Sequence, residues 1–217
     1  MTENTSVKRK AIVYIDGFNL YFAINDKGWR DLLWLDLVDL AKRLIDPARQ
    51  ELVSVKYFTS PILGPEDKRL RQVAYLDALE TTKPMLEIFK GHYLEGHNEC
   101  DECGKRWRDD KEKQTDVNIA VQMVLDAHIP GKVDDMILIT VDSDQCPAVL
   151  AVRTLGKRVL CVIPPGRAYL LQLQQASDSR FELTRNKLKK CLFPETVEAA
   201  NGTKIHRPVE YAPMSAK

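Results

Sequence analysis

The chain has 217 residues, 44% of them hydrophobic, and its 32 basic and 31 acidic side chains leave a formal net charge of +1. This length suits one domain with a short appendage, and the near balance of charge excludes a strongly basic nucleic-acid coat protein. No apolar run is long enough to span a membrane, and residues 1–10 lack the apolar core of a signal peptide. With an odd number of cysteines, five, these features predict reduced thiols, a cytoplasmic location and no membrane contact.

Apolar periodicity predicts strands and helices in alternation. In chain order these are a strand at 11–15, a helix at 35–44, a strand at 51–59, a helix at 67–81, a strand at 86–94, a helix at 117–128, a strand at 137–141, a helix at 147–155, a strand at 158–163 and a helix at 168–176. This order predicts an α/β fold with a mainly parallel sheet and helices on both faces. The helix at 117–128 is expected to bury one apolar stripe: Val117, Ala120, Val121, Val124 and Leu125.

The domain is expected to occupy residues 11–195, after an N-terminal extension at 1–10. A polar insertion at about 92–113 interrupts it between a strand and the following helix. Residues 196–217 form the C-terminal segment, which is rich in proline and polar residues from Asn201 and is expected to be loose.

Two apolar runs end abruptly in carboxylates. AIVYIDGFNLY, residues 11–21, ends its run at Asp16, and MILITVDSDQCPAV, residues 136–149, ends its run at Asp142 and Asp144. Asp116 opens the helix between them. The carboxyl ends of parallel strands share one edge of the sheet, where ligands bind, so these acids should converge. Crowded carboxylates repel one another unless a cation lies among them, and hard oxygen ligands suit Mg2+ or Mn2+.

Three blocks carry a resemblance to a known family: YIDGFNLY, then EKQTDVNIAVQMVLDA, then LITVDSDQCPAV. In this order they resemble the NYN domain, a PIN-like nuclease fold that includes bacterial LabA-type proteins, over roughly residues 10–165. The resemblance implies a PIN-like, Rossmann-like sheet and a metal-dependent ribonuclease-like centre. One departure from the family pattern is that Thr140-Val141 precedes the acid where a small Ser-Gly pair is commoner, and Val141 is bulkier than glycine at a point where the backbone would approach a ligand. The positions that match the family are Asp16, Asn19, Asp116, Asp142 and Asp144.

Phosphodiester hydrolysis needs an activated water and neutralised phosphate oxygens, and carboxylate-bound divalent ions supply both. We assign Asp16 and Asp142 as direct metal ligands. Asp116 and Asp144 are further ligands, directly or through water, or bases that position the water. Two neighbouring polar residues are expected to assist: Asn19, placed in the turn after the first acid, by holding a carboxylate or a substrate oxygen, and Ser143 by similar contacts.

Each acid also has a purely structural explanation. A carboxylate after a strand often caps the next helix or closes a turn. Asp144 is placed to cap the helix that begins near Pro147, and Asp116 is placed as an ordinary acid in the first turn of a helix. Structural caps have no reason to converge, so their convergence would favour the catalytic interpretation.

The polar insertion contains His92, His97, Cys100 and Cys103, followed by Gly104. A Cys-x2-Cys pair before glycine is typical of a zinc knuckle, and the two histidines would complete a tetrahedral Zn2+ site. A structural metal would also order a segment with little apolar content. The alternative is an ordinary loop with two reduced thiols.

One basic cluster in the insertion, Arg106-Trp107-Arg108, combines positive charge with an indole. It is the best candidate in the chain for contacting a phosphate backbone and stacking on a base. The alternative is a solvated loop face, and Asp109, Asp110 and Glu112 partly cancel its charge.

Three functions remain open from the sequence. The first is a divalent-metal ribonuclease with RNA as its substrate. The second follows from the resemblance alone, because one bacterial member of the family has been assigned as an NADH-dependent 6-hydroxy-3-succinoylpyridine 3-monooxygenase, which acts on a small aromatic substrate. The chain has no G-x-G-x-x-G motif to support NADH binding independently. The third is an RNA-binding module without turnover.

Overall fold

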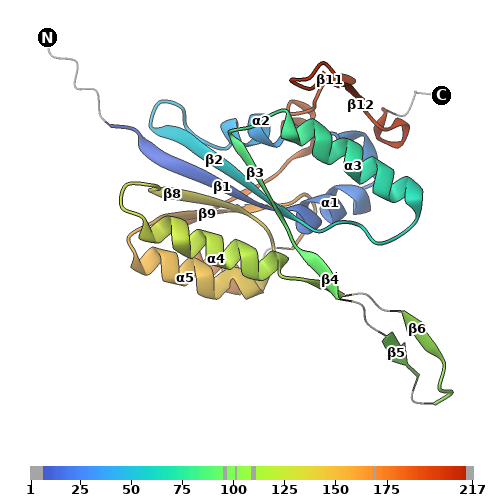
Figure 1. Ribbon diagram of the computed structural model, residues 1–217. Helices are drawn as coiled ribbons and strands as arrows, with labels where there is room; N and C mark the ends of the chain where they lie inside the picture. The colour runs from blue at the N-terminus through green and yellow to red at the C-terminus, as the bar shows by residue number, and fades with distance from the viewer. Residues whose placement is uncertain (1–6, 95–96, 101, 109–110, 169, 214–217) are drawn as a thin grey trace, which may run out of the picture.

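The computed structural model describes residues 7–94, 97–100, 102–108, 111–168 and 170–213. Its main sheet has six strands in the order β10-β9-β8-β1-β2-β3, and every neighbouring pair is parallel (Figure 1). The predicted mainly parallel α/β sheet is therefore confirmed. The strands are Arg9–Asp16 (β1), Gln50–Thr59 (β2), Leu86–Lys90 (β3), Asp135–Ile139 (β8), Arg158–Ile163 (β9) and Ser179–Glu182 (β10).

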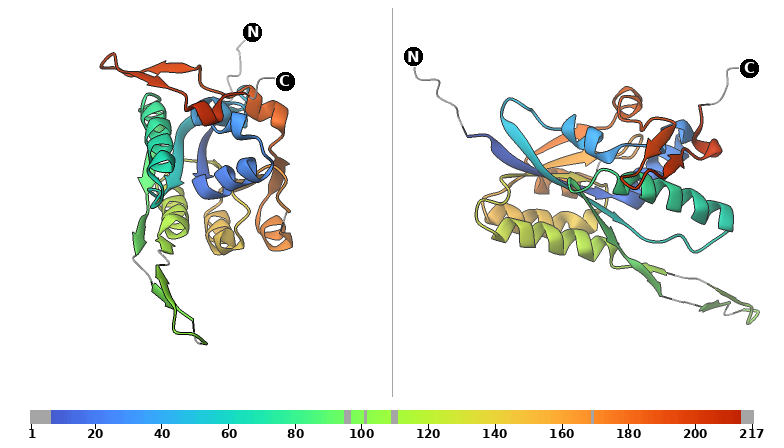
Figure 2. Two further views of the ribbon diagram at one scale, coloured as in Figure 1. Left: turned by 90° about the vertical axis from the view of Figure 1, so that its right-hand side faces the viewer. Right: turned by 45° about the horizontal axis from the view of Figure 1, so that its top comes forward.

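Helices cover both faces of this sheet (Figures 1 and 2). On one face lie Gly17–Asp26 (α1), Leu37–Lys42 (α2), Glu66–Glu80 (α3) and Arg185–Lys189 (α7), and on the other lie Thr115–His128 (α4), Cys146–Thr154 (α5) and Leu171–Ala176 (α6). Three short 3-10 turns complete the set: Arg30–Leu32 (η1), Ser143–Gln145 (η2) and Val209–Tyr211 (η3). No helix in the described ranges is long and apolar enough to cross a membrane.

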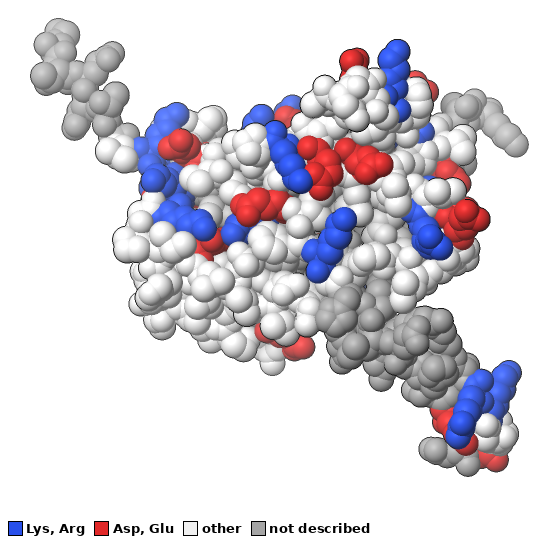
Figure 3. Space-filling view, in the orientation of Figure 1, with Lys and Arg blue, Asp and Glu red and all other residues white. Residues whose placement is uncertain are grey.

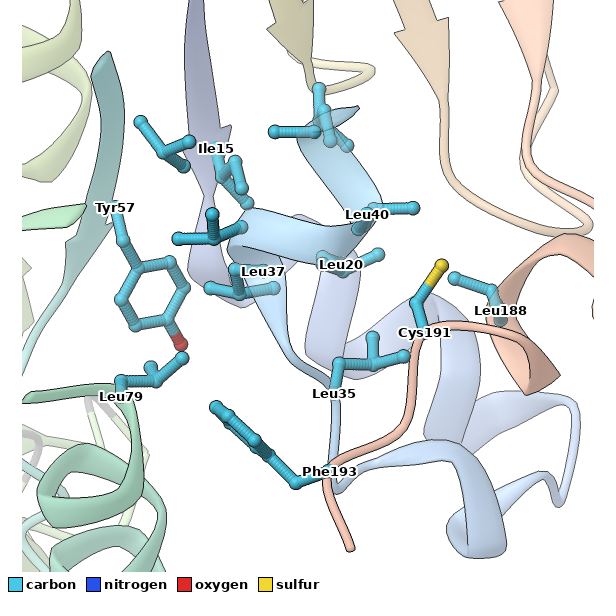
Figure 4. Packing of buried hydrophobic residues seen from close by; sticks show 14 of the residues in the cluster. Ile15, Leu20, Leu35, Leu37, Leu40, Tyr57, Leu79, Leu188, Cys191 and Phe193 are labelled. Carbon is cyan, nitrogen blue, oxygen red and sulfur yellow. The ribbon is translucent and has the colours of Figure 1, made fainter. Parts of the chain in front are cut away.

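Strand β1 is central to both hydrophobic cores. Its neighbours are β2 and β8, and its side chains alternate between the two faces. Val13 and Ile15 pack into the core under α1 and α2, whereas Ile12 and Tyr14 pack into the core under α4 and α5. Figure 4 shows the first core, with Ile15 facing leucines from α1 and α2. Because β1 is buried on both faces, its sequence is a continuous apolar run.

The insertion forms two small antiparallel ladders that project away from the main body (Figures 1 and 2). The first ladder pairs His92–Leu94 (β4) with Lys111–Lys113 (β7), and the second pairs His97–Glu99 (β5) with Arg106–Arg108 (β6).

Helix α1 is absent from the sequence prediction, which places a turn after Asp16. Its sequence, GFNLYFAIND, opens with glycine and is rich in aromatic residues, so propensity alone does not favour a helix. Asp16 is nevertheless the N-cap and accepts a hydrogen bond from the backbone N–H of Asn19. Asn19 therefore lies in the first turn of a helix and not in a loop.

The C-terminal segment is ordered over its described residues, 196–213, although the sequence predicts a loose tail. Thr196–Glu198 (β11) pairs antiparallel with Lys204–His206 (β12), which lies beside α3. Tyr211 in η3 is only 6% exposed and belongs to the same core as α1 and α2. An ion pair of 2.7 Å between Arg71 of α3 and Glu210 fixes this segment to the body.

The predicted buried stripe of α4 is wrong. Val117 is 62% exposed and Leu125 is 51% exposed, whereas the helix buries Ile119, Met123 and Ala127. In Figure 3 the side of the molecule over α4 and α5 carries few charged side chains, as these outward apolar residues require.

A buried ionic group sets the rotation of α4. Asp126 is 1% exposed and lies 2.8 Å from the ammonium of Lys56, which is itself 3% exposed on β2. It also accepts a hydrogen bond of 2.7 Å from the Tyr14 hydroxyl and pairs with Lys132 at 2.7 Å. Burial alone would raise the pKa of Asp126, but these donors hold it below its usual value. Turning α4 to bury the predicted stripe would take this carboxylate away from its partners.

We expect Lys56→Met to lower the free energy of unfolding at pH 7 by about 3 kcal/mol, because it leaves a buried carboxylate short of a counter-ion. Urea unfolding measures the change. Lys42→Met, at an exposed position in α2, is the control and should change stability by less than about 0.5 kcal/mol. Equal effects of the two substitutions would contradict the role given to the buried pair.

Candidate active site

Two neighbouring parallel strands, β1 and β8, bring Asp16 and Asp142 to the same edge of the sheet. Ile15 of β1 lies opposite Ile139 of β8, and each strand ends directly after this pair. Asp16 closes β1 and caps α1, while Asp142 caps η2 after the link through Thr140 and Val141. The predicted convergence of these two acids at the carboxyl end of the sheet therefore holds in the structure.

Asp16 is almost fully enclosed, with 1% of its surface exposed. One carboxylate oxygen accepts a hydrogen bond of 3.0 Å from the backbone N–H of Asn19. The other accepts from the side-chain amide of Asn19 and, at 3.0 Å, from the hydroxyl of Thr140. Asn19 thus holds the carboxylate, which is one of the two roles predicted for it.

Thr140 links the two acids, and the sequence analysis gave it no role. Its side chain is fully buried, and its hydroxyl donates to Asp16 while accepting 3.1 Å from the backbone N–H of Asp142. The signal available in the sequence is a small hydroxyl residue between an apolar strand and an acid. Thr140 is followed directly by Val141, the bulky residue before the acid Asp142.

The environment of Asp16 disfavours its negative charge. Burial raises the pKa of this carboxyl, hydrogen bonds from Asn19 and Thr140 act in the opposite direction, and the nearby charge of Asp142 raises it further. A cation beside Asp16 would relieve both the desolvation and the repulsion.

A hollow of about 320 Å³ opens above these acids. It is lined by Asp16, Asp116 and Asp142 together with Asn19, Thr115, Phe18 and Phe22. Three of the four predicted acids therefore face one space. The fourth, Asp144, is exposed and is absent from the lining, although its backbone N–H donates to Asp142 at 2.9 Å.

The structural explanations hold only in part. Asp16 and Asp142 are genuine caps, but they cap elements that begin at the same edge and they face the same hollow. Asp144 does not cap α5, whose N-cap is Gln145. Capping therefore accounts for the local backbone at two acids and leaves their convergence unexplained.

Gln145 is a further residue that the sequence analysis missed. It is 1% exposed, and its side-chain amide donates 3.1 Å to the backbone carbonyl of Asp116. This bond connects η2 to the start of α4 and so fixes the position of Asp116 relative to Asp142. Over the described ranges, its Oε1 is the buried side-chain polar atom that has no hydrogen-bond partner.

The donor chemistry of the hollow suits a hard divalent cation. Within the described residues, however, no three or more His, Cys, Asp or Glu side chains are close enough to hold an ion by themselves. Mg2+ is commonly bound by one or two carboxylates with water and substrate phosphate oxygens completing its octahedron. Asp16 and Asp142 would be the protein ligands of such a shared site, and Asp116 lines the same hollow.

The tip of the β5–β6 hairpin has the backbone of a cysteine knuckle. The N–H of Gly104 donates 2.8 Å to the carbonyl of Cys100, and Gly104 has a φ of +65°, which favours glycine. Hydrogen bonds from the backbone N–H groups of Cys103 and Glu102 lower the pKa of the Cys100 thiol. The side chains of His92 and His97 lie outside the described part of the chain, so zinc stays a prediction.

The predicted substrate-binding residues fall in two places. Ser143 is half-buried in η2 between Asp142 and Asp144, beside the hollow. Arg106 is exposed on the projecting hairpin, where it pairs with Glu99 at 2.6 Å. Only the backbone of Trp107 and Arg108 is described, in β6, and their side chains lie outside that description.

Comparisons with known proteins show the family and the fold that this chain resembles. A family model for the NYN domain matches residues 10–183. The 6-hydroxy-3-succinoylpyridine 3-monooxygenase HspA of Pseudomonas putida is 29% identical over 188 residues, which cover 70% of this chain and 58% of that protein. The chain thus spans little more than half the length of this relative. A protein of unknown function from Vibrio parahaemolyticus, VPA0982, has a similar fold, with a TM-score of 0.54 and 18% identity over 89% of this chain and 100% of that one.

We expect Asp16→Asn to become progressively more stable than the wild type as the pH rises from 4 to 7 in metal-free buffer. The raised pKa means that the folded wild type binds its proton more tightly than the unfolded chain, whose value is about 3.9, so its stability falls across this range. Asparagine carries no charge to desolvate. Urea unfolding at each pH measures the difference.

The control for this series is Asp36→Asn. Asp36 is also an N-cap, accepting 2.9 Å from the N–H of Val38 in α2, but it lies away from the hollow. Asp36→Asn should not become more stable than the wild type over the same range, because it replaces one capping side chain by another outside the hollow. If the free energies of unfolding of the two variants changed with pH in the same way, burial of the Asp16 charge would not be the cause.

We expect the chain purified without added metal to carry zinc bound by Cys100 and Cys103. The lowered thiol pKa favours the thiolate, and thiolate ligands select a softer ion than carboxylates do. Elemental analysis should find less zinc in Cys103→Ser, while Cys161→Ser, in the core, should keep it. Wild-type protein without zinc, with both hairpin thiols freely titratable, would support the plain loop.

Proposed function

Because the chain belongs to the NYN domain family, a PIN-like nuclease family, we propose that it is a divalent-metal-dependent ribonuclease that hydrolyses phosphodiester bonds. The observation that supports this most directly is the pairing of Asp16 with Asp142. Adjacent parallel strands place them at one edge, and the Thr140 hydroxyl bridges them. Members of this nuclease family act on RNA, which is the substrate class we propose here.

Asp16 and Asp142 would hold the ion, and Asp116, which lines the same hollow, would act on it through water. Such an ion would neutralise charge on a phosphate oxygen and lower the pKa of a bound water. Without it, three carboxylates around one hollow would repel a phosphodiester. The acidic lining and a polyanionic substrate are therefore compatible only when a cation lies between them.

The remaining residues position this centre. Asn19 and Thr140 fix the carboxylate of Asp16 through three hydrogen bonds, so its oxygens keep one orientation. Asp144 is exposed next to Asp142 and does not line the hollow, so we assign it an outer role, positioning the attacking water through a further water. Ser143, between them, is placed to contact a phosphate oxygen.

We expect the wild type to cleave single-stranded RNA when Mg2+ or Mn2+ is added. Asp142→Asn should lower the rate by roughly a hundredfold or more, because a lost charge at the ion removes several kcal/mol of transition-state stabilisation. Gel analysis of a labelled RNA measures the rate, and Asp36→Asn serves again as the N-cap control. Full activity in Asp142→Asn would remove the ligand assignment.

A second candidate is an NADH-dependent monooxygenase acting on 6-hydroxy-3-succinoylpyridine. One specific observation favours it, the similarity to the Pseudomonas putida enzyme of that name. A parallel incubation with NADH and this pyridine, followed by NADH absorbance, distinguishes the two. RNA that is bound but never cleaved under any divalent ion would instead favour a binding module.

A further inference from the structure

A second cavity, of about 220 Å³, lies beside the acidic hollow and shares Phe18 and Phe22 of α1 with it. It is more apolar than the hollow and is lined by aromatic rings from four elements. These are Phe18, Tyr21 and Phe22 of α1, Tyr57 of β2, Tyr75 of α3 and Tyr211 of η3.

Close packing at the start of α1 brings the cavity next to the acids. A Cβ on Gly17 would lie 2.6 Å from the carbonyl oxygen of Phe58 and 2.8 Å from the ring of Tyr57. Only glycine allows α1 to begin this close to β2, directly after Asp16. Asp16 lines the hollow and the next residue, Gly17, lines the aromatic cavity, so the two spaces are one residue apart along the chain.

The walls of the cavity are fixed in place. The Tyr75 hydroxyl donates 3.0 Å to the carbonyl of Leu35, and its ring meets Tyr57 edge to face with centroids 6.5 Å apart. The side-chain amide of Gln72 makes two hydrogen bonds to the loop after β2. It donates to the carbonyl of Ser60 at 2.8 Å and accepts from the backbone N–H of Ile62 at 2.7 Å. The cavity is therefore preformed, which lowers the entropy cost of binding.

We propose that this cavity receives one unpaired base of a single-stranded RNA whose phosphate lies in the acidic hollow, an inference that rests on the proposed nuclease function. Its volume is below the roughly 300–1,000 Å³ typical of sites for drug-sized ligands, so it suits a small planar group. Aromatic side chains are the usual platforms for unstacked bases.

The shared phenylalanines supply the link between base and phosphate. Phe18 and Phe22 lie with centroids 6.1 Å apart and planes 19° from parallel, and Phe22 is 48% exposed at the mouth. The exposed Lys68 of α3 lines the same cavity, and its positive charge would face the phosphate backbone of the bound RNA. Burial raises the pKa of Tyr57 to about 12, so its hydroxyl stays protonated at working pH.

This placement makes the enzyme selective for single strands. A base paired in an A-form duplex is stacked on both sides and cannot enter a closed aromatic cavity without leaving its helix. We therefore expect a single-stranded RNA to be bound more tightly than a duplex of the same sequence.

The proposal is tested by substituting a bulky side chain that fills the cavity and lies outside the acidic hollow. Ile62 lines it from the loop, whereas its neighbour Leu63 is 50% exposed and is absent from the lining. We expect Ile62→Trp to raise the Kd for a labelled single-stranded RNA roughly tenfold, as loss of one stacked base would. Leu63→Trp, of equal size, should bind like the wild type. Fluorescence anisotropy with Ca2+ in place of Mg2+ or Mn2+ measures binding, and a gel of the same samples shows that the RNA stays intact.

A series of RNAs with single abasic positions identifies the base. One such position should weaken binding to the Leu63→Trp control and leave binding to Ile62→Trp unchanged, because that variant has already lost the contact. Equal binding of RNA by the two tryptophan variants would overturn the proposal. Wild-type protein that binds RNA in this way but never cleaves it would remove the nuclease function and leave the base site intact.

A small aromatic acid is the competing occupant. If 6-hydroxy-3-succinoylpyridine binds the wild type and Ile62→Trp abolishes that binding while RNA binding stays unchanged, the base site is overturned in favour of a metabolite site. Matching thermal unfolding of the two tryptophan variants confirms that both fold.

Discussion

The site depends on one constraint, a charged carboxylate placed at the end of a strand that is buried on both faces. β1 lies between β2 and β8 at the centre of the sheet, so the residue that ends it inherits almost complete burial. Asp16 is stabilised there by Asn19 and Thr140, yet its pKa remains raised. Hydrogen bonds orient this carboxylate without fully compensating its charge, and the orientation is towards Asp142 and the hollow. Under the proposed function, this loss of stability would be recovered when a cation binds beside the carboxylate.

The sequence predicted the sheet and its edge well because both follow from burial. Strands β1 and β8 are enclosed on both faces, so they read as apolar runs, and parallel topology then places Asp16 and Asp142 together. The prediction failed where a partner distant in sequence decides the local structure. Helix α4 has apolar residues on both sides, and its rotation follows from the buried pair of Asp126 with Lys56, which no periodicity in the helix encodes. The C-terminal segment is likewise held by contacts with distant elements, including one tyrosine, Tyr211, in the core.

The acids were predicted more completely than the residues that support them. Asp16, Asp116 and Asp142 follow from motif and topology, whereas Thr140 and Gln145 act through hydrogen bonds to neighbours that only the folded chain brings close. Thr140 receives the backbone N–H of one acid and donates to the other, so it fixes their relative position. Val141, the next residue, is half-buried and does not line the hollow, so its side chain leaves the space between the acids open.

Helix α1 is the element that makes the acidic edge specific, and it is the one that propensity concealed. If the acidic hollow holds a cation and a phosphate as proposed, it still distinguishes no base, because every nucleotide presents the same phosphate. The aromatic cavity alone offers stacking but has no group for hydrolysis. Gly17 starts the helix directly after Asp16, and Phe18 and Phe22 then face both spaces. The aromatic run that made this segment look unlike a helix is therefore the feature that joins the chemistry of the acids to recognition of a planar ring.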